Sequence, residues 1–127
     1  MVRELADALH QRGRLVRMHK QVFPDGTPDR VWIPEVASRG WIIVTRDRRL
    51  QTRHMEWMAI RRAKARVLWF KGDRASNVDI TEGFLKALPK IDALAAALQP
   101  PYIIKITVAG YVEQIYPAPD TADVDTP

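Results

Sequence analysis

The 127-residue sequence contains no cysteine, which excludes disulfide bonds and zinc–thiolate sites. No apolar run approaches the roughly 20 residues that a helix needs to cross a bilayer. The first residues, MVRELADALHQRG, are charged and amphipathic, unlike a secretory signal. These absences lead us to expect a cytoplasmic protein with no membrane partner.

The chain also lacks the short motifs of several enzyme classes. It has no G-x-x-x-x-G-K-[ST], no G-x-G-x-x-G and no H-E-x-x-H, so nucleotide-binding loops and zincin sites have no support. The three histidines, His10, His19 and His54, do not have the spacing of metal ligands. Carboxylates are therefore the side chains that remain for chemistry.

Acidic residues are scarce in the middle of the chain. Between Arg39 and Arg74 there are eleven Lys or Arg residues against three acids, within a net charge of +5. Such a block of positive charge favours a polyanionic partner, usually nucleic acid, because binding releases counterions. A solvated arginine-rich surface without a ligand is the alternative.

Hydrophobic spacing predicts alternating helices and short strands. Helices are expected near residues 2–11, 27–39, 52–65 and 77–98, the last split by Pro89, and strands near 15–19, 41–45, 67–70, 102–108 and 111–116. This order predicts a three-layer α/β/α sandwich with a mostly parallel central sheet and a C-terminal β-hairpin with Ala109–Gly110 as its connection. The apolar run WIIVT is interpreted as a central strand, with Trp41 and Trp69 in the core. Residues 1–117 are expected to form one domain and residues 118–127 a disordered acidic tail.

Two aspartates are candidate metal ligands, and one of them, Asp47, is expected where a parallel sheet places its ligands. Asp29 is in the first turn of a helix that Thr27 is expected to cap, and Asp47 follows the strand at 41–45. Hard cations such as Mg²⁺ and Mn²⁺ prefer carboxylate oxygens, and Glu35 is a candidate third ligand. Each aspartate also has a plainer interpretation, Asp29 as an acid at a helix dipole and Asp47 as a turn residue paired with arginine.

The stretch TPDRVWIPEVASRGWIIVTRDRRL resembles the PIN-like ribonuclease domains of bacterial toxin–antitoxin type, the VapC-like PIN-like group. ITEGFLKALPKI and PPYIIKITVAGYVEQIYP resemble the end of that group, so the likeness extends over roughly residues 2–117. The resemblance implies an α/β/α nuclease that cuts RNA with Mg²⁺ or Mn²⁺, in which Asp29 and Asp47 are the catalytic metal ligands. The residues expected to contact the RNA backbone are Arg46, Arg48, Arg49 and Arg53.

The family's first strand carries a leading aspartate, and neither has a counterpart before the helix that begins at Val2. A start codon placed too far downstream, a truncation without activity and a partner that supplies the strand are the three explanations. We prefer the first, because the pattern from Val2 onward is intact.

A metal-dependent endoribonuclease, the toxin of a toxin–antitoxin pair, is the leading functional hypothesis. A catalytically inactive RNA-binding domain and a protein-interaction module that docks an acidic protein are the alternatives. The expected partners are RNA and an antitoxin protein, with a homodimer as a further assembly.

Overall fold

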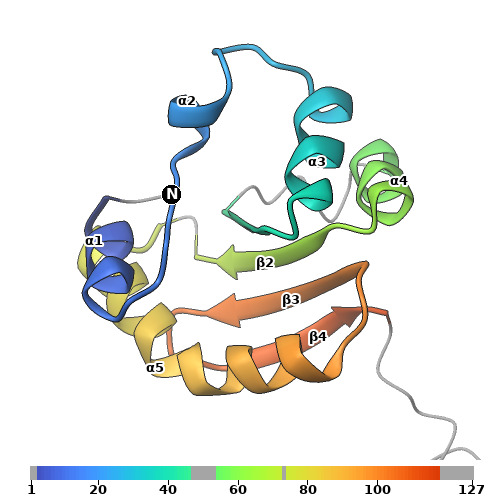
Figure 1. Ribbon diagram of the computed structural model, residues 1–127. Coiled ribbons are helices and arrows are strands. Elements are labelled where there is room, and N and C mark those ends of the chain that lie inside the picture. The colour runs from blue at the N-terminus through green and yellow to red at the C-terminus, as the bar shows by residue number, and fades with distance from the viewer. Residues whose placement is uncertain (1–2, 47–53, 73, 118–127) are drawn as a thin grey trace, which may run out of the picture.

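Helices cover both faces of a four-stranded sheet in the computed structural model, which describes residues 3–46, 54–72 and 74–117 (Figure 1). The described elements are, in chain order, α1 (Arg3–Gln11), α2 (His19–Val22), α3 (Asp29–Ser38), β1 (Ile42–Thr45), α4 (His54–Ala63), β2 (Arg66–Lys71), α5 (Asn77–Ala97), β3 (Tyr102–Thr107) and β4 (Val112–Tyr116). This arrangement confirms the predicted three-layer α/β/α sandwich.

The strands lie in the order β1-β2-β3-β4. The first three are parallel, and β4 runs antiparallel to β3, so the predicted C-terminal hairpin is confirmed. Four residues, 108–111, connect its strands instead of the two expected, because Gly110 turns the chain with a φ of +89°. The sheet is therefore mostly parallel, as the alternation of helices and strands predicts.

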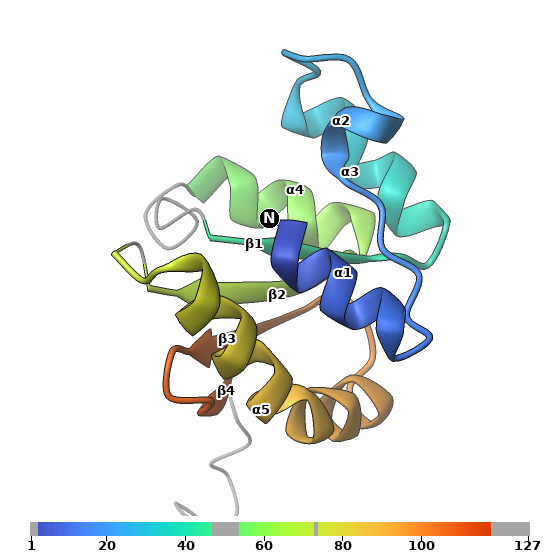
Figure 2. The ribbon, with the colours of Figure 1, turned by 90° about the vertical axis from the view of Figure 1, so that its left-hand side faces the viewer.

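One core layer lies between the sheet and the pair α1 and α5 (Figure 2). Alternate strand residues point to this face because successive side chains of a strand lie on opposite sides. The predicted apolar stripe of α1 is confirmed, since Leu5, Ala6 and Leu9 are buried. The larger side chains of this layer are Leu5, Leu9, Leu68, Phe70, Ile80, Phe84, Ile91, Tyr102, Ile104 and Ile106.

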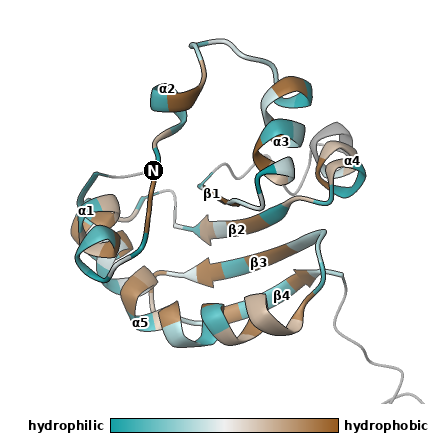
Figure 3. Cartoon of the chain, in the orientation of Figure 1, coloured by the Kyte–Doolittle hydropathy of each residue, from teal (hydrophilic) through white to brown (hydrophobic). Residues whose placement is uncertain are grey.

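A second core layer lies between the sheet and the pair α3 and α4. Its buried members are Ile33, Ile60, Ala65, Val67, Trp69 and Ile103. Trp69 is 2% exposed, which confirms its predicted place in the core. Figure 3 shows hydrophobic residues on the strands and on the helices that flank them. No helix within the described ranges has both the length and the apolar character needed to span a membrane.

The predicted strand at residues 15–19 is wrong. The chain runs without regular structure up to Met18, and α2 begins at His19. Val16 does pack against the core, which explains the alternating pattern, but its N–H is bonded to the His10 side chain instead of a neighbouring strand. Leu15 is 78% exposed. The pattern was correct about burial on one side and wrong about strand pairing.

The prediction that the run at 41–45 forms a central strand is also wrong. Among the described residues β1 pairs with β2 alone and forms the edge of the sheet, and Ile42 is 44% exposed. Trp41 precedes the strand and is half-buried, outside both core layers. An apolar run indicates a strand but does not say how many neighbours it has.

Two predicted details of the helices differ from the structure. Pro28, not Thr27, occupies the N-cap of α3, and the Thr27 hydroxyl donates to the carbonyl of Pro24. Helix α5 continues through Pro89 instead of splitting there. Pro89 is exposed, so water can reach the carbonyl of Leu85, whose helical partner the proline removes.

A candidate acidic site at the carboxyl edge of the sheet

Helix α3, which carries Asp29 in its first turn, is followed directly by strand β1. The chain reverses between them at Gly40, whose φ of +71° lies in the region that favours glycine. From Asp29 to Ser38 the helix is about 14 Å long, and from Ile42 to Arg46 the strand is about 13 Å long. In Figure 1 α3 stands steeply on the sheet, and its start lies farther from the strands than its end. Asp29 is therefore at the outer end of this helix.

The carboxylate of Asp29 is held in place by a neighbour one helical turn away. Trp32 Nε1 donates to Asp29 Oδ1 at 2.9 Å in a part-buried setting. The Trp32 ring in turn packs edge-on against His19, with centroids 4.9 Å apart, and lies 6.4 Å from Phe23. Helix α2, of which only His19 belonged to the predicted strand, thus packs against the indole that orients the acid. The i, i+3 spacing of Asp29 and Trp32 is the sequence signal that predicts this contact.

Arg46 joins the carboxyl ends of two strands. Its Nη2 donates to the carbonyl oxygen of Gly72 at 3.0 Å, just after β2 ends at Lys71. Gly72 is closely packed, since a Cβ there would lie 2.8 Å from Val108 Cγ2. The contact with Gly72 was not predicted from the sequence, and it places a guanidinium at the carboxyl edge of the sheet.

Glu35 does not join Asp29. The two residues are six positions apart on α3, a rise of about 9 Å along the helix axis. Glu35 Oε1 instead accepts from Arg39, at 3.0 Å from Nε and 2.9 Å from Nη2. The structure therefore places Glu35 near the far end of the helix, in an exposed ion pair.

The remaining candidates, Asp47, Arg48, Arg49 and Arg53, lie outside the described residues. Within the described ranges, no three His, Asp or Glu side chains come close enough to hold a metal ion together. Asp29 contributes one half-buried carboxylate, and Mg²⁺ is commonly held by one or two carboxylates plus substrate phosphate. Asp29 therefore has the chemistry of one such ligand.

Comparison with protein families gives a match to the model described as a PIN like domain over residues 1–72. The match covers 72 of the 127 residues and runs from α1 to the end of β2, so it includes Asp29 and Asp47. Comparisons with curated proteins and with solved structures gave no significant match.

Proposed function

The chain belongs to the family of PIN-like domains, and from this premise we propose that it is a metal-dependent endoribonuclease. PIN-like domains are a nuclease-type family that generally depends on divalent metal. The observation that carries the proposal is the placement of Asp29. Its carboxylate is half-buried in the first turn of α3, where Trp32 orients it.

In this proposal Asp29 and Asp47 hold Mg²⁺ or Mn²⁺. A bound divalent ion supplies a water of lowered pKa and neutralises charge on the scissile phosphate. Trp32 limits the rotation of the Asp29 carboxylate, so less of its freedom is lost when a ligand binds. Arg46 ties the ends of β1 and β2 together, while Arg48, Arg49 and Arg53 offset phosphate charge. Glu35 is not a metal ligand in this proposal, because it forms an ion pair with Arg39.

An RNA-binding domain without catalysis is the second candidate function. It is favoured by the excess of eleven Lys or Arg residues over three acids between Arg39 and Arg74. Such a domain would bind RNA with steep salt dependence but without any need for metal. The two candidates are therefore separated by metal dependence.

The test is cleavage of a labelled single-stranded RNA by the 127-residue chain in Mn²⁺, with and without EDTA. Asp29→Asn and Asp47→Asn remove the two proposed ligands at constant size. Glu82→Gln, at an exposed position on α5, makes the same chemical change away from the site and serves as the matched control. Glu35→Gln tests the choice of ligands, because we expect it to keep full metal dependence.

We expect cleavage to disappear in EDTA and to fall by at least about a hundredfold in both aspartate variants. Glu82→Gln and Glu35→Gln should cleave like the parent chain. Cleavage that survives EDTA, or that falls equally in Glu82→Gln, would contradict the proposal. RNA binding without cleavage, from protein with a normal circular dichroism spectrum, would favour the second candidate.

We further propose that the nuclease is the toxin of a toxin–antitoxin pair, with residues 1–117 as its domain. Induced expression should then arrest bacterial growth, because a free endoribonuclease degrades cellular RNA. Asp47→Asn at equal protein level should relieve the arrest, and removal of residues 118–127 should not. Arrest that persists with Asp47→Asn would argue against a toxin that acts by cleavage.

A further inference from the structure

The amino ends of the parallel strands form a second edge of the sheet, opposite the candidate site. The register places Ile42 beside Arg66, Arg66 beside Tyr102, and Ile103 beside Tyr116. Trp41, which precedes β1, and Tyr116, which ends β4, therefore lie at the two corners of this edge. Three strand spacings separate them, about 14 Å.

At the first corner an aromatic ring lies among arginines. The guanidinium carbon of Arg39 lies 4.9 Å from the centroid of the Trp41 ring, and that of Arg17 lies 5.8 Å away. Arg39 forms an ion pair with Glu35, whereas Arg17 is exposed and belongs to the segment before α2. Trp41 itself is half-buried, so part of it remains open to a ligand.

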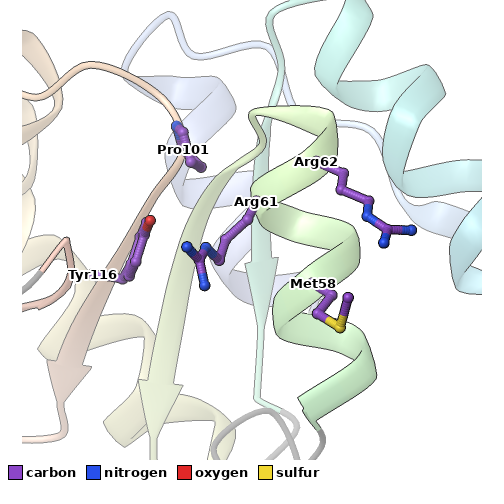
Figure 4. Close-up of a pocket in the computed structure, with 5 residues that line it drawn as sticks. All are labelled: Met58, Arg61, Arg62, Pro101 and Tyr116. Carbon is purple, nitrogen blue, oxygen red and sulfur yellow. The ribbon is translucent and has the colours of Figure 1, made fainter.

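At the second corner a shallow groove of about 520 Å³ lies between α4 and the end of β4. Its lining includes Arg61, Arg62, Pro101 and Tyr116. Figure 4 shows Arg61 reaching from α4 toward Tyr116, while Arg62 points to the other side of the helix. The Arg61 guanidinium lies 5.3 Å from the centroid of the Tyr116 ring, and Trp57 packs edge-on against the same ring at 6.0 Å.

Arg66 lies between the two corners. Its Nη1 approaches the turn at Gly40, 3.9 Å from where a Cβ of that residue would be. Of the cations at this edge, Arg39 forms an ion pair with Glu35 among the described residues. The register partner of Arg66 is Tyr102, which lies in the core layer of α1 and α5, so the Arg66 side chain leaves the sheet on that face, whereas Tyr116 packs on the face of α3 and α4. The two corners together are called the amino-edge surface, made of Arg17, Arg39, Trp41, Arg61 and Tyr116.

We propose that the amino-edge surface binds single-stranded RNA at a place separate from the carboxyl-edge acids. Arginines attract the phosphate backbone, and aromatic rings and guanidinium planes stack on unpaired bases. A duplex hides its base faces and cannot use those rings, and an acidic protein would use the charges but not the stacking. The chemistry therefore favours an unpaired polynucleotide.

The two edges lie about 17 Å apart along β2, the length of five strand rises. An RNA that occupies both must bridge this distance, so the amino-edge surface holds a part of the strand away from the acids. The inference rests on the proposed function only in taking the ligand to be RNA. It adds a surface that selects long, unpaired RNA over short or base-paired RNA.

The first test measures binding of a fluorescent oligouridine of about 20 nucleotides by anisotropy, in EDTA so that no cleavage occurs. Arg17→Gln with Arg61→Gln removes one exposed cation from each corner. Lys86→Gln with Lys90→Gln removes two exposed cations from α5, on the other face of the sheet, and is the charge-matched control. Thermal melts by circular dichroism confirm that each variant is folded.

We expect the Arg17/Arg61 variant to bind about tenfold more weakly and its salt slope to fall by about 1.4, or 0.7 for each lost phosphate contact. The control should change affinity by less than about twofold on the same scale. Equal losses in both double variants would overturn the proposal, because net charge alone would then explain binding. An unchanged affinity in the Arg17/Arg61 variant would overturn it as well.

A second test separates stacking from charge. Tyr116→Leu keeps every charge and removes a ring, so it should weaken oligouridine binding by about fivefold or more while the salt slope stays constant. A base-paired RNA and polyglutamate serve as competitors, and both should compete poorly. Polyglutamate that competes as well as oligouridine would overturn the proposal in favour of an acidic protein partner.

Binding in EDTA and cleavage in Mn²⁺ are independent measurements. Oligouridine binding that depends on Arg17 and Arg61, without cleavage, would sustain the amino-edge surface and contradict the nuclease. Cleavage that depends on Asp47, with binding indifferent to Arg17 and Arg61, would do the reverse. The failure of one proposal can therefore be told from the failure of the other.

Discussion

Gly83 lies where helix α5 meets the hairpin loop, and its replacement by alanine tests this packing. A Cβ at Gly83 would lie 2.4 Å from the carbonyl oxygen of Val108 and 3.2 Å from that of Thr107. Ordinary van der Waals contact begins at 3.4 Å, so the nearer contact is 1.0 Å too short. Both contacts are backbone atoms, so no side chain can rotate away to relieve the clash.

Relief therefore requires α5 to move away from the loop. The move would loosen Phe84 and Ala87, which are buried next to Gly83 in the core layer. Overpacking of this kind costs about 1–3 kcal/mol, and the better helix propensity of alanine returns up to about 1 kcal/mol. We expect Gly83→Ala to lower the free energy of unfolding by about 1–2 kcal/mol and the Tm by about 5–10 °C.

The measurement is a pair of thermal and urea melts followed by circular dichroism. Glu82→Ala is the matched control, because Glu82 is exposed on the same turn of α5 and reports helix propensity without the clash. Its Tm should stay within a few degrees of the parent, about 1–3 °C. If Gly83→Ala is as stable as Glu82→Ala, then α5 does not approach the hairpin backbone this closely and the reasoning fails.

Two further perturbations follow from the surface of the fold. Arg14 is hydrogen-bonded to Asp92 at 2.9 and 2.6 Å, and these bonds lower the pKa of Asp92. Arg14→Gln should lower the free energy of unfolding by about 0.2–1 kcal/mol near neutral pH. This loss should disappear as the pH falls through the lowered pKa of Asp92, because the protonated carboxyl no longer attracts Arg14. In urea melts Arg12→Gln should show no such pH dependence. Ile42→Lys places a charge on the edge strand β1 and should reduce self-association in sedimentation velocity. Val31→Lys, at an exposed position on α3, is the control and should reduce it less. Equal effects of the two variants would mean that the edge strand does not drive association.

The sequence predicts the layers of this fold well because burial leaves a periodic trace. Leu5, Ala6 and Leu9 share a helical face, and the run around Trp69 is apolar on both sides. Burial is also where the sequence misleads. Val16 is partly buried in an extended segment, and its alternating pattern is the same whether or not a neighbouring strand is present.

The candidate site was predictable in part. Placing Asp29 at the start of a helix and Asp47 after a strand needs only local patterns, and the structure confirms the first. Which residues lie close to Asp29 cannot be predicted from local patterns. Glu35 is near Asp29 in sequence, yet the helical rise and Arg39 take it elsewhere. The contact of Arg46 with Gly72 joins residues 26 positions apart and leaves no pattern in the sequence.

From residue 29 onward the sequence by itself determined the order of helices and strands, and it also determined the sandwich and the cationic middle of the chain, because these depend on composition and on spacing within short segments. Only the tertiary structure decided that β1 lies at the described sheet's edge and that the Arg17 and Arg39 side chains gather on Trp41. Arg17 and Trp41 come from different parts of the chain, and no local rule relates them. They meet because α3 reverses into β1 at Gly40 and returns the chain to the segment before α2.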